Sequence, residues 1–355
     1  MQRTPAAAEG LARALALWNR GQRLGARRCL EAVLSSDLEL QLRPGGPELA
    51  AALGEEGADG LPDADWAVLM HEQLQNSGRP IEAERWRLAM RLRGCRLPVA
   101  TGAPVLRLVH HLACSGGTLI SQCLAALPGV ALLSEVNPFN RYAPVFAPSQ
   151  PLLLLERGHR PLQEEEIGAG FRAELELVQR ICQQDDVALV LRDHSHTDFC
   201  MGSEPAAQPG LRRLLAADQP QLAVLTLRHP LDCWLGLVAA GWQGQQSPAT
   251  LLEYCRRVEA FLAAYPDLPR VAYEDFCLEP ARWLAELAEE LALPFEAAAL
   301  ERFGEIKLTG ASGRRSERIE PRPRRPLPQE VSEELADPAC RAALNHLCEA
   351  MGYPI

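Results

Sequence analysis

Lysine is almost absent from this sequence. Of the 36 basic residues in a chain of 355, Lys307 is the only lysine and the other 35 are arginines. A phosphate-binding loop of the type G-x-x-x-x-G-K-[ST] requires a lysine to reach the terminal phosphates of a nucleoside triphosphate. The sequence therefore excludes any mechanism that depends on a phosphate-loop lysine.

Long apolar runs, excess positive charge and paired cysteines are lacking too. No run reaches the roughly 18 apolar residues of a membrane span, and the N-terminus lacks the basic start and apolar stretch of a secretory signal. The net charge is −10, so no global basic field would gather nucleic acid or anionic lipid. The eleven cysteines contain no C-x-x-C pair, which removes the usual spacing of a zinc site. We expect a soluble cytoplasmic protein with reduced cysteines, no metal, no nucleic-acid partner and no membrane span.

Residues 1–100 have helical periodicity. Apolar residues recur at helical spacing in Leu11–Leu34 and Trp66–Leu92, with glycine- and proline-rich breaks between them. The segment Gly21–Ala26 weakly resembles the second half of a tetratricopeptide repeat, and a similar pattern recurs 57 residues later, with Ala83 in the place of Ala26. We expect an all-α module, formed by plain helical hairpins or by degenerate repeats, that docks a protein partner or shapes the acceptor site.

The periodicity changes at a linker, Pro98–Pro104, and residues 104–355 alternate short apolar runs with helical patterns. The predicted strands are Val105–His111, Val130–Ser134, Val187–Arg192, Leu222–Leu227 and Arg270–Tyr273. The predicted helices cover residues 118–128, 165–184, 231–241, 248–264 and 280–292. Such alternation predicts an α/β domain with a parallel sheet and helices on both faces.

Four segments of this domain are suited to binding an anion. The first strand runs into Ser115-Gly-Gly-Thr118, where backbone N–H groups and a helix N-terminus can converge on a phosphate. A later strand ends at Arg228, at the edge where parallel sheets hold ligands. The third segment, Val271–Pro280, reads as a strand, an acidic turn and a proline-initiated helix. The fourth, Lys307–Arg318, is a Gly/Ser loop with basic residues, and residues 312–326 carry six arginines against two glutamates.

In this order the four segments resemble the sulfotransferase family, which transfers a sulfuryl group from 3′-phosphoadenosine 5′-phosphosulfate to a hydroxyl or amine acceptor without a metal. Ala113-Cys-Ser-Gly-Gly-Thr118 matches the family's P-[KR]-S-G-T-T loop, and Arg228–Gly236 matches its R-[ND]-P-x-D-x-x-x-S segment. The resemblance implies a P-loop three-layer sandwich over residues 104–355. It also implies a set of cofactor-binding residues: Cys114, Ser115, Gly116, Gly117, Thr118, Arg228, Gly236, Arg314 and Arg315.

Two positions depart from the family pattern. Cys114 replaces the basic residue of the loop, and Gly236 replaces the serine that closes the second motif. Losing a charge-stabilising donor typically costs about 100- to 1000-fold in rate. Either another arginine supplies the charge, with Arg192, Arg228 and Arg314 as candidates, or turnover is slow or absent.

Three side chains at the ligand edge are candidates for the general base. His194 and His196 follow the third strand, and Glu135 follows the second. The resemblance fits both kinds, since some members of the family use a histidine after the third strand and others a glutamate near the second. A neutral imidazole suits proton abstraction near neutral pH, so we rank His194 first and Glu135 second. Asp193 could orient a histidine, although an H-x-H pair at a strand end can equally be structural.

The sequence leaves the function open between three classes. The first is a sulfotransferase whose acceptor is a small molecule, glycan or peptide, with acceptor loops at residues 139–165 and 195–212. The second is a noncatalytic nucleotide-binding or scaffold protein with a degraded sulfotransferase site. The third is an unusual P-loop kinase, against which the missing lysine counts.

Overall fold

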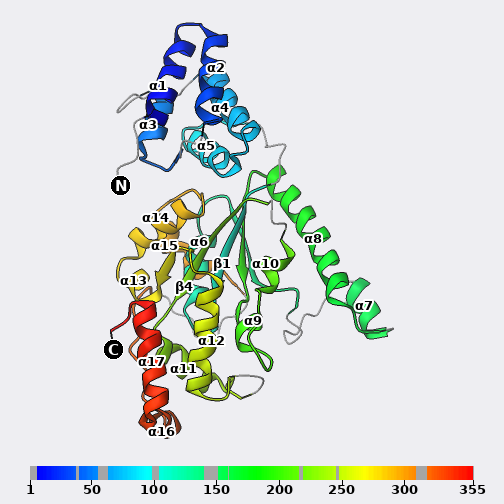
Figure 1. Cartoon of the computed structure of the whole chain (residues 1–355), viewed down its shortest axis with the longest axis vertical. Coiled ribbons are helices and arrows are strands. Elements are labelled where there is room, and N and C mark those ends of the chain that lie inside the picture. Colours follow the sequence, from blue (N-terminus) through cyan, green and yellow to red (C-terminus); the bar gives the residue numbers. More distant parts are fainter. Residues whose placement is uncertain are drawn as a thin grey trace. The chain divides into compact units, whose positions relative to one another are not determined.

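The computed structural model describes residues 6–36, 40–54, 63–97, 104–139, 151–158, 160–215, 219–244, 248–308 and 318–354. The chain divides into two compact units (Figure 1). One unit contains Met1–Leu106 with the short segments Asp218–Leu222 and Ala292–Pro294, and the other contains the remainder.

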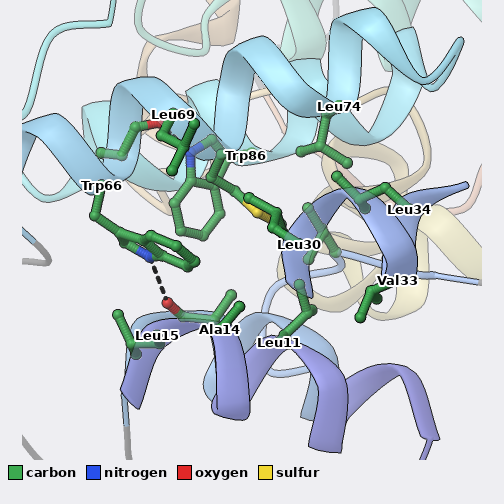
Figure 2. Packing of buried hydrophobic residues seen from close by; sticks show 14 of the residues in the cluster. Leu11, Ala14, Leu15, Leu30, Val33, Leu34, Trp66, Leu69, Leu74 and Trp86 are labelled. Atoms are coloured by element: carbon green, nitrogen blue, oxygen red, sulfur yellow. Dashed lines mark hydrogen bonds between the residues drawn. The ribbon is translucent and has the colours of Figure 1, made fainter. Parts of the chain in front are cut away.

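The N-terminal unit is helical in its described part. Its helices are α1 (Ala6–Asn19), α2 (Arg23–Leu34), α3 (Pro47–Leu53), α4 (Ala64–Asn76) and α5 (Pro80–Leu92). Trp66 and Trp86 lie fully buried at its centre, among leucines of α1, α2 and α4 (Figure 2). Each indole N–H donates to a backbone carbonyl, at 3.1 Å to Ala52 and 2.9 Å to Ala67, so both rings are buried without an unpaired donor. The predicted helical character is confirmed, and the tetratricopeptide-like origin of this unit stays a prediction.

The second unit is built on a five-stranded sheet with the order β2-β3-β1-β4-β5. The strands are β1 (Leu106–His111), β2 (Val130–Val136), β3 (Ala188–Asp193), β4 (Gln221–Leu227) and β5 (Arg270–Ala272). β3 runs parallel to both of its neighbours, and β4 runs parallel to β5. The strands β1 and β3 are buried along their whole length, as expected for a sheet covered on two faces. The predicted α/β fold class is confirmed.

Helices connect and cover these strands. They are α6 (Gly117–Ala125), α7 (Pro151–Gly158), α8 (Glu164–Gln184), α9 (His196–Cys200), α10 (Gly210–Leu214), α11 (Pro230–Ala240), α12 (Leu251–Ala264), α13 (Tyr273–Leu278), α14 (Pro280–Glu290), α15 (Ala299–Arg302), the 3₁₀ turn Phe303–Glu305, α16 (Gln329–Ala336) and α17 (Pro338–Met351). α6 packs against α13, α14 and α15, whereas α12 packs against α9, α11 and α17 (Figure 1). The connection from β1 to β2 and the connection from β4 to β5 run in opposite directions along the sheet. Because crossovers between parallel strands are right-handed, the helices around α6 and the helices around α12 lie on opposite faces of the sheet.

One sequence prediction about the third anion-binding segment is wrong. The pattern predicts a strand through Tyr273 followed by an acidic turn, but β5 ends at Ala272 and Tyr273 opens α13. Glu274 and Asp275 lie in the first turn of α13, where carboxylates interact favourably with the helix dipole. Pro280 then begins a separate helix, α14, as prolines often do at a first helical position.

Among the described residues, no helix combines the length and the apolar character needed to cross a bilayer. All eleven cysteines lie in the described part of the chain, and each is a free thiol.

Candidate active site

The loop between β1 and α6 is shaped by close packing of its glycines. Gly116 has a left-handed φ of +83°, and a Cβ there would lie 2.2 Å from a ring carbon of Tyr273. A Cβ on Gly117 would lie 2.8 Å from the ring of His111. The Ser115 hydroxyl donates to the Leu112 carbonyl at 2.8 Å and so stabilises the loop itself. At positions 116 and 117, at the start of α6, this backbone path therefore has no room for a residue larger than glycine.

The second departure from the family pattern is in contact with the first. Cys114 has a φ of +64°, and its side chain lies against α11 at Gly236, where a Cβ would come 2.8 Å from Cys114 Cβ and 3.0 Å from Sγ. Burial raises the pKa of the Cys114 thiol to about 11, against the opposing effect of nearby Arg228 and Arg325. Cys114 is therefore neutral near pH 7 and brings no charge to the loop.

The strand-end arginine Arg228 reaches the same loop. Its Nη1 donates to the Cys114 carbonyl at 3.4 Å, and its guanidinium carbon lies 4.7 Å from the ring centroid of Tyr273. Glu274 Oε1 lies 3.9 Å from Arg228 Nε and accepts the backbone N–H of His229 at 3.3 Å. The first three predicted anion-binding segments thus meet at one place, although more than 100 residues separate the first two.

The fourth segment is described only in part. Arg314 and Arg315, which the family resemblance assigns to the cofactor, lie outside the described residues. Beyond them, Arg324 pairs with Asp232 of α11, with Nε 3.0 Å from Oδ1. Arg325 is near enough to affect the pKa of Cys114, and Arg322 that of Tyr273. The described end of this basic segment therefore adds positive potential beside the loop.

Arg192, at the end of β3, joins the loop to β2. Its side chain is 2% exposed, and its Nη2 donates to the hydroxyl of Thr118 at 2.9 Å. Its Nη1 donates to Ser134 Oγ and lies 2.8 Å from Glu135 Oε1. Of the two described arginines considered as substitutes for the missing loop cation, Arg192 and Arg228, Arg192 is the one bonded to the side chain of Thr118.

The two leading base candidates form a single pair. Glu135 has a φ of +59° at an irregularity in the β2–β3 register, and this conformation brings its Oε2 to 3.0 Å from His194 Nε2. His194 Nδ1 is 2.6 Å from the Thr197 hydroxyl. Burial lowers the pKa of His194, and the Arg192 charge lowers it further, while Glu135 and Asp193 act in the opposite direction. His194 and Glu135 therefore form one hydrogen-bonded unit, and which of them is the base stays a prediction.

Asp193 and His196 have other partners. Asp193 Oδ2 is 2.8 Å from Nδ1 of His110 and accepts from the Ser195 hydroxyl at 2.7 Å, so it orients a histidine of β1 and not His194. Burial lowers the pKa of His196 to about 3. Its Nδ1 accepts the backbone N–H of Ala113 at 3.4 Å, which supports the loop. A catalytic role for His196 stays a prediction.

Asp198 ties the segment after β2 to the segment after β3. Its Oδ2 accepts the backbone N–H of Gly210 at 2.9 Å and lies 3.3 Å from Asn137 Nδ2. Burial, followed by the charge of Asp193, raises the pKa of Asp198 to about 6. A carboxyl whose pKa is higher in the folded than in the unfolded chain adds stability at low pH, and that stability is lost as the pH rises through the folded value.

We therefore expect wild type to gain about 1 kcal/mol of unfolding free energy relative to Asp198→Asn when the pH falls from 7 to 5. Urea denaturation of both proteins at several pH values measures this difference. A difference that is flat across this range, or that grows with rising pH, contradicts the assigned environment of Asp198.

Sequence reasoning missed two members of the site. Thr197 carries no motif of its own, and only its position three residues after His194 hints that a helical turn would bring the two together. Tyr353, close to the end of the described chain, donates its hydroxyl hydrogen to Glu274 Oε2 at 2.7 Å. Nothing in the sequence links these two residues. Within the described residues, no group of three or more His, Cys, Asp or Glu side chains could hold a metal ion.

Comparisons with known proteins found no matching family model and no matching curated protein. The solved structures that are similar to this chain include two sulfotransferase domains. The sulfotransferase domain of the Synechococcus PCC 7002 olefin synthase is 15% identical, with 73% of this chain and 98% of that chain covered and a TM-score of 0.45. The sulfotransferase domain from the curacin biosynthetic pathway is 16% identical, with 73% and 100% covered and a TM-score of 0.45.

Proposed function

We propose that the chain is a sulfotransferase that binds 3′-phosphoadenosine 5′-phosphosulfate beside the β1–α6 loop. The acceptor, a hydroxyl or amine of a small molecule, glycan or peptide, would enter near Glu135 and His194. The observation that carries this proposal is the contact between Arg228 and the Cys114 carbonyl, which unites the two segments that resemble the family's phosphate-binding motifs.

The residues present fit such a donor. Gly116 and Gly117 bring backbone against two rings where a Cβ has no room, and Gly116, the N-cap residue of α6, makes no side-chain cap hydrogen bond. A helix start of this kind favours an anionic group. Arg228 and the basic segment around Arg325 would hold further phosphate oxygens. The bound donor would supply the sulfuryl group.

Arg192 and the Glu135–His194 pair would share the remaining tasks. Arg192 would act as the cation that Cys114 cannot be, because its guanidinium is bonded to Thr118 at the loop and is almost fully buried, where a charge interacts strongly. The Glu135–His194 pair would receive the proton of the acceptor. Holding these groups in place before the reaction is the main contribution expected of the protein in a transfer of this type.

The test is a thermal-shift titration with 3′,5′-adenosine bisphosphate, and with ATP in the presence and absence of Mg²⁺. We expect the bisphosphate to stabilise wild type without Mg²⁺. Arg228→Ala should weaken its binding about 10- to 100-fold, because a hydrogen bond to a charged group is worth about 1.5–3 kcal/mol. Arg282→Ala, which removes an exposed arginine from α14, is the matched control and should bind as wild type does. An ATP shift that requires Mg²⁺, or no shift with the bisphosphate, would refute the proposal.

A noncatalytic nucleotide-binding protein is the second candidate, and the neutral Cys114 thiol favours it. Release of labelled sulfate from ³⁵S-labelled donor distinguishes the two. A chain that binds the bisphosphate but never releases sulfate faster than buffer is a binding protein. Release above that background establishes a working site.

A further inference from the structure

The contacts of His194 fix which of its ring nitrogens can take a proton. Glu135 is ion-paired with Arg192 and is therefore a carboxylate, which can only accept hydrogen bonds. Its Oε2 faces His194 Nε2 at 3.0 Å, so Nε2 carries the hydrogen of this contact. Burial lowers the pKa of His194, which makes the neutral ring the main form near pH 7. A neutral imidazole with hydrogen on Nε2 has its lone pair on Nδ1.

Thr197 occupies that lone pair. Its Oγ1 is 2.6 Å from His194 Nδ1, a separation that leaves no space for another heavy atom between them. The backbone N–H of Thr197 donates to the His194 carbonyl at 3.0 Å, so the first turn of α9 fixes the hydroxyl in this position. A hydroxyl that donates to Nδ1 keeps its own oxygen lone pairs as acceptors for a second O–H group. Thr197 is half-buried, whereas the neighbouring Ser195 and His196 are buried.

We propose that Thr197 is a proton relay between the acceptor and His194, an inference that rests on the proposed sulfotransferase function. The acceptor O–H bond breaks as its proton passes to Thr197 Oγ1, and the hydrogen of Thr197 passes to His194 Nδ1. The acceptor oxygen forms its new bond to sulfur, and the bond between sulfur and the donor phosphate oxygen breaks with its electron pair on that oxygen. Glu135, already bonded to Nε2, stabilises the resulting imidazolium, so charge and protons balance.

In this relay the two base candidates, His194 and Glu135, have different roles. His194 is the final proton acceptor, through Nδ1 and never through Nε2. Glu135 is a positioning residue that fixes the tautomer, as carboxylates do for other functional histidines. The groups that set the charge balance around the ring are Glu135, Asp193 and Arg192.

The first test needs neither donor nor acceptor. Long-range ¹H–¹⁵N spectra of histidine-labelled wild type at pH 8, with His194 assigned by its absence in His194→Gln, should show hydrogen on Nε2 and an Nδ1 shift typical of a hydrogen-bonded lone pair. Thr197→Ser should keep this Nδ1 shift, and Thr197→Val should move it toward that of a free lone pair. Hydrogen on Nδ1 in wild type would overturn the relay, whatever the function of the chain.

The second test measures transfer with water as the acceptor, as release of labelled sulfate from ³⁵S-labelled donor. Thr197→Val should lower the rate constant about 100-fold or more, the usual range for loss of proton transfer, with donor affinity unchanged. Thr197→Ser should remain within about 10-fold of wild type, and thermal unfolding shows whether both variants are folded. Unchanged release by folded Thr197→Val overturns the relay alone. No release by wild type overturns the relay together with the catalytic function, while binding of the bisphosphate is judged separately.

Discussion

Replacing Arg192 by methionine is expected to lower the free energy of unfolding by about 3–5 kcal/mol, the usual cost of removing one partner from a buried ion pair. The guanidinium is 2% exposed and bonds Thr118, Ser134 and Glu135 at 2.8–2.9 Å. Methionine fills a similar volume but leaves the Glu135 carboxylate facing an apolar side chain. Urea denaturation gives the change in unfolding free energy.

Two comparisons make this result specific to the buried pair. Arg282→Met removes an exposed arginine with two surface partners and should leave the free energy of unfolding close to that of wild type, because water and salt screen exposed ion pairs. The double variant Arg192→Met/Glu135→Gln should be more stable than the sum of its two single variants predicts, because it leaves no buried charge unpaired. A loss below about 1 kcal/mol in Arg192→Met would contradict the burial and pairing of this side chain.

Replacing Gly116 by alanine is expected to have the second large effect. A left-handed φ costs a non-glycine residue about 1–2 kcal/mol, and overpacking against a ring typically adds about 1–3 kcal/mol. The new Cβ would lie 2.2 Å from Cδ2 of Tyr273, the ring that carries Arg228 on its face. We therefore expect a loss of about 2–5 kcal/mol together with weaker binding of 3′,5′-adenosine bisphosphate.

Gly241→Ala is the matched control for this prediction. Gly241 ends α11 with a φ of +68°, and a Cβ there would meet nothing within 4 Å. This variant should lose only the backbone contribution of about 1–2 kcal/mol and should bind the bisphosphate as wild type does. Equal losses of stability in the two variants would show that contact with Tyr273 contributes nothing.

The sheet could be predicted from the sequence because its signals are local. Short apolar runs bounded by turn residues marked the strands, and the observed β1 to β5 start and end within about two residues of the predicted ranges. The one clear error, at Tyr273, arose because the carboxylates after it were read as a turn when they open a helix. Helix-terminus preferences and turn preferences involve the same residue types, so a short segment does not separate them.

Several residues of the candidate site could be named from the sequence, but Thr197, Tyr353 and the pairings between the side chains could not. His194 and Glu135 were both found, because ends of parallel strands gather at one edge. Their direct contact depends on the positive φ of Glu135, which lies at an irregularity in the β2–β3 register. The residue types in this segment do not predict that conformation. Likewise, Arg192 lies in a strand that is buried throughout. A single arginine in an apolar run does not predict which carboxylate it pairs with, here that of Glu135.

The approach of the β1–α6 loop to α11 imposes a steric rule on two positions at once. Cys114 Cβ lies 2.8 Å from the point where residue 236 would carry its own Cβ, so in this backbone only one of the two positions can hold a side chain. A basic residue at position 114 and a serine at position 236 therefore cannot both be placed on this backbone. Placing a side chain at position 236 requires the loop to move away from α11. Arg192, bonded to the Thr118 hydroxyl, and Arg228, bonded to the Cys114 carbonyl, already bring positive charge to the loop without any change at position 114.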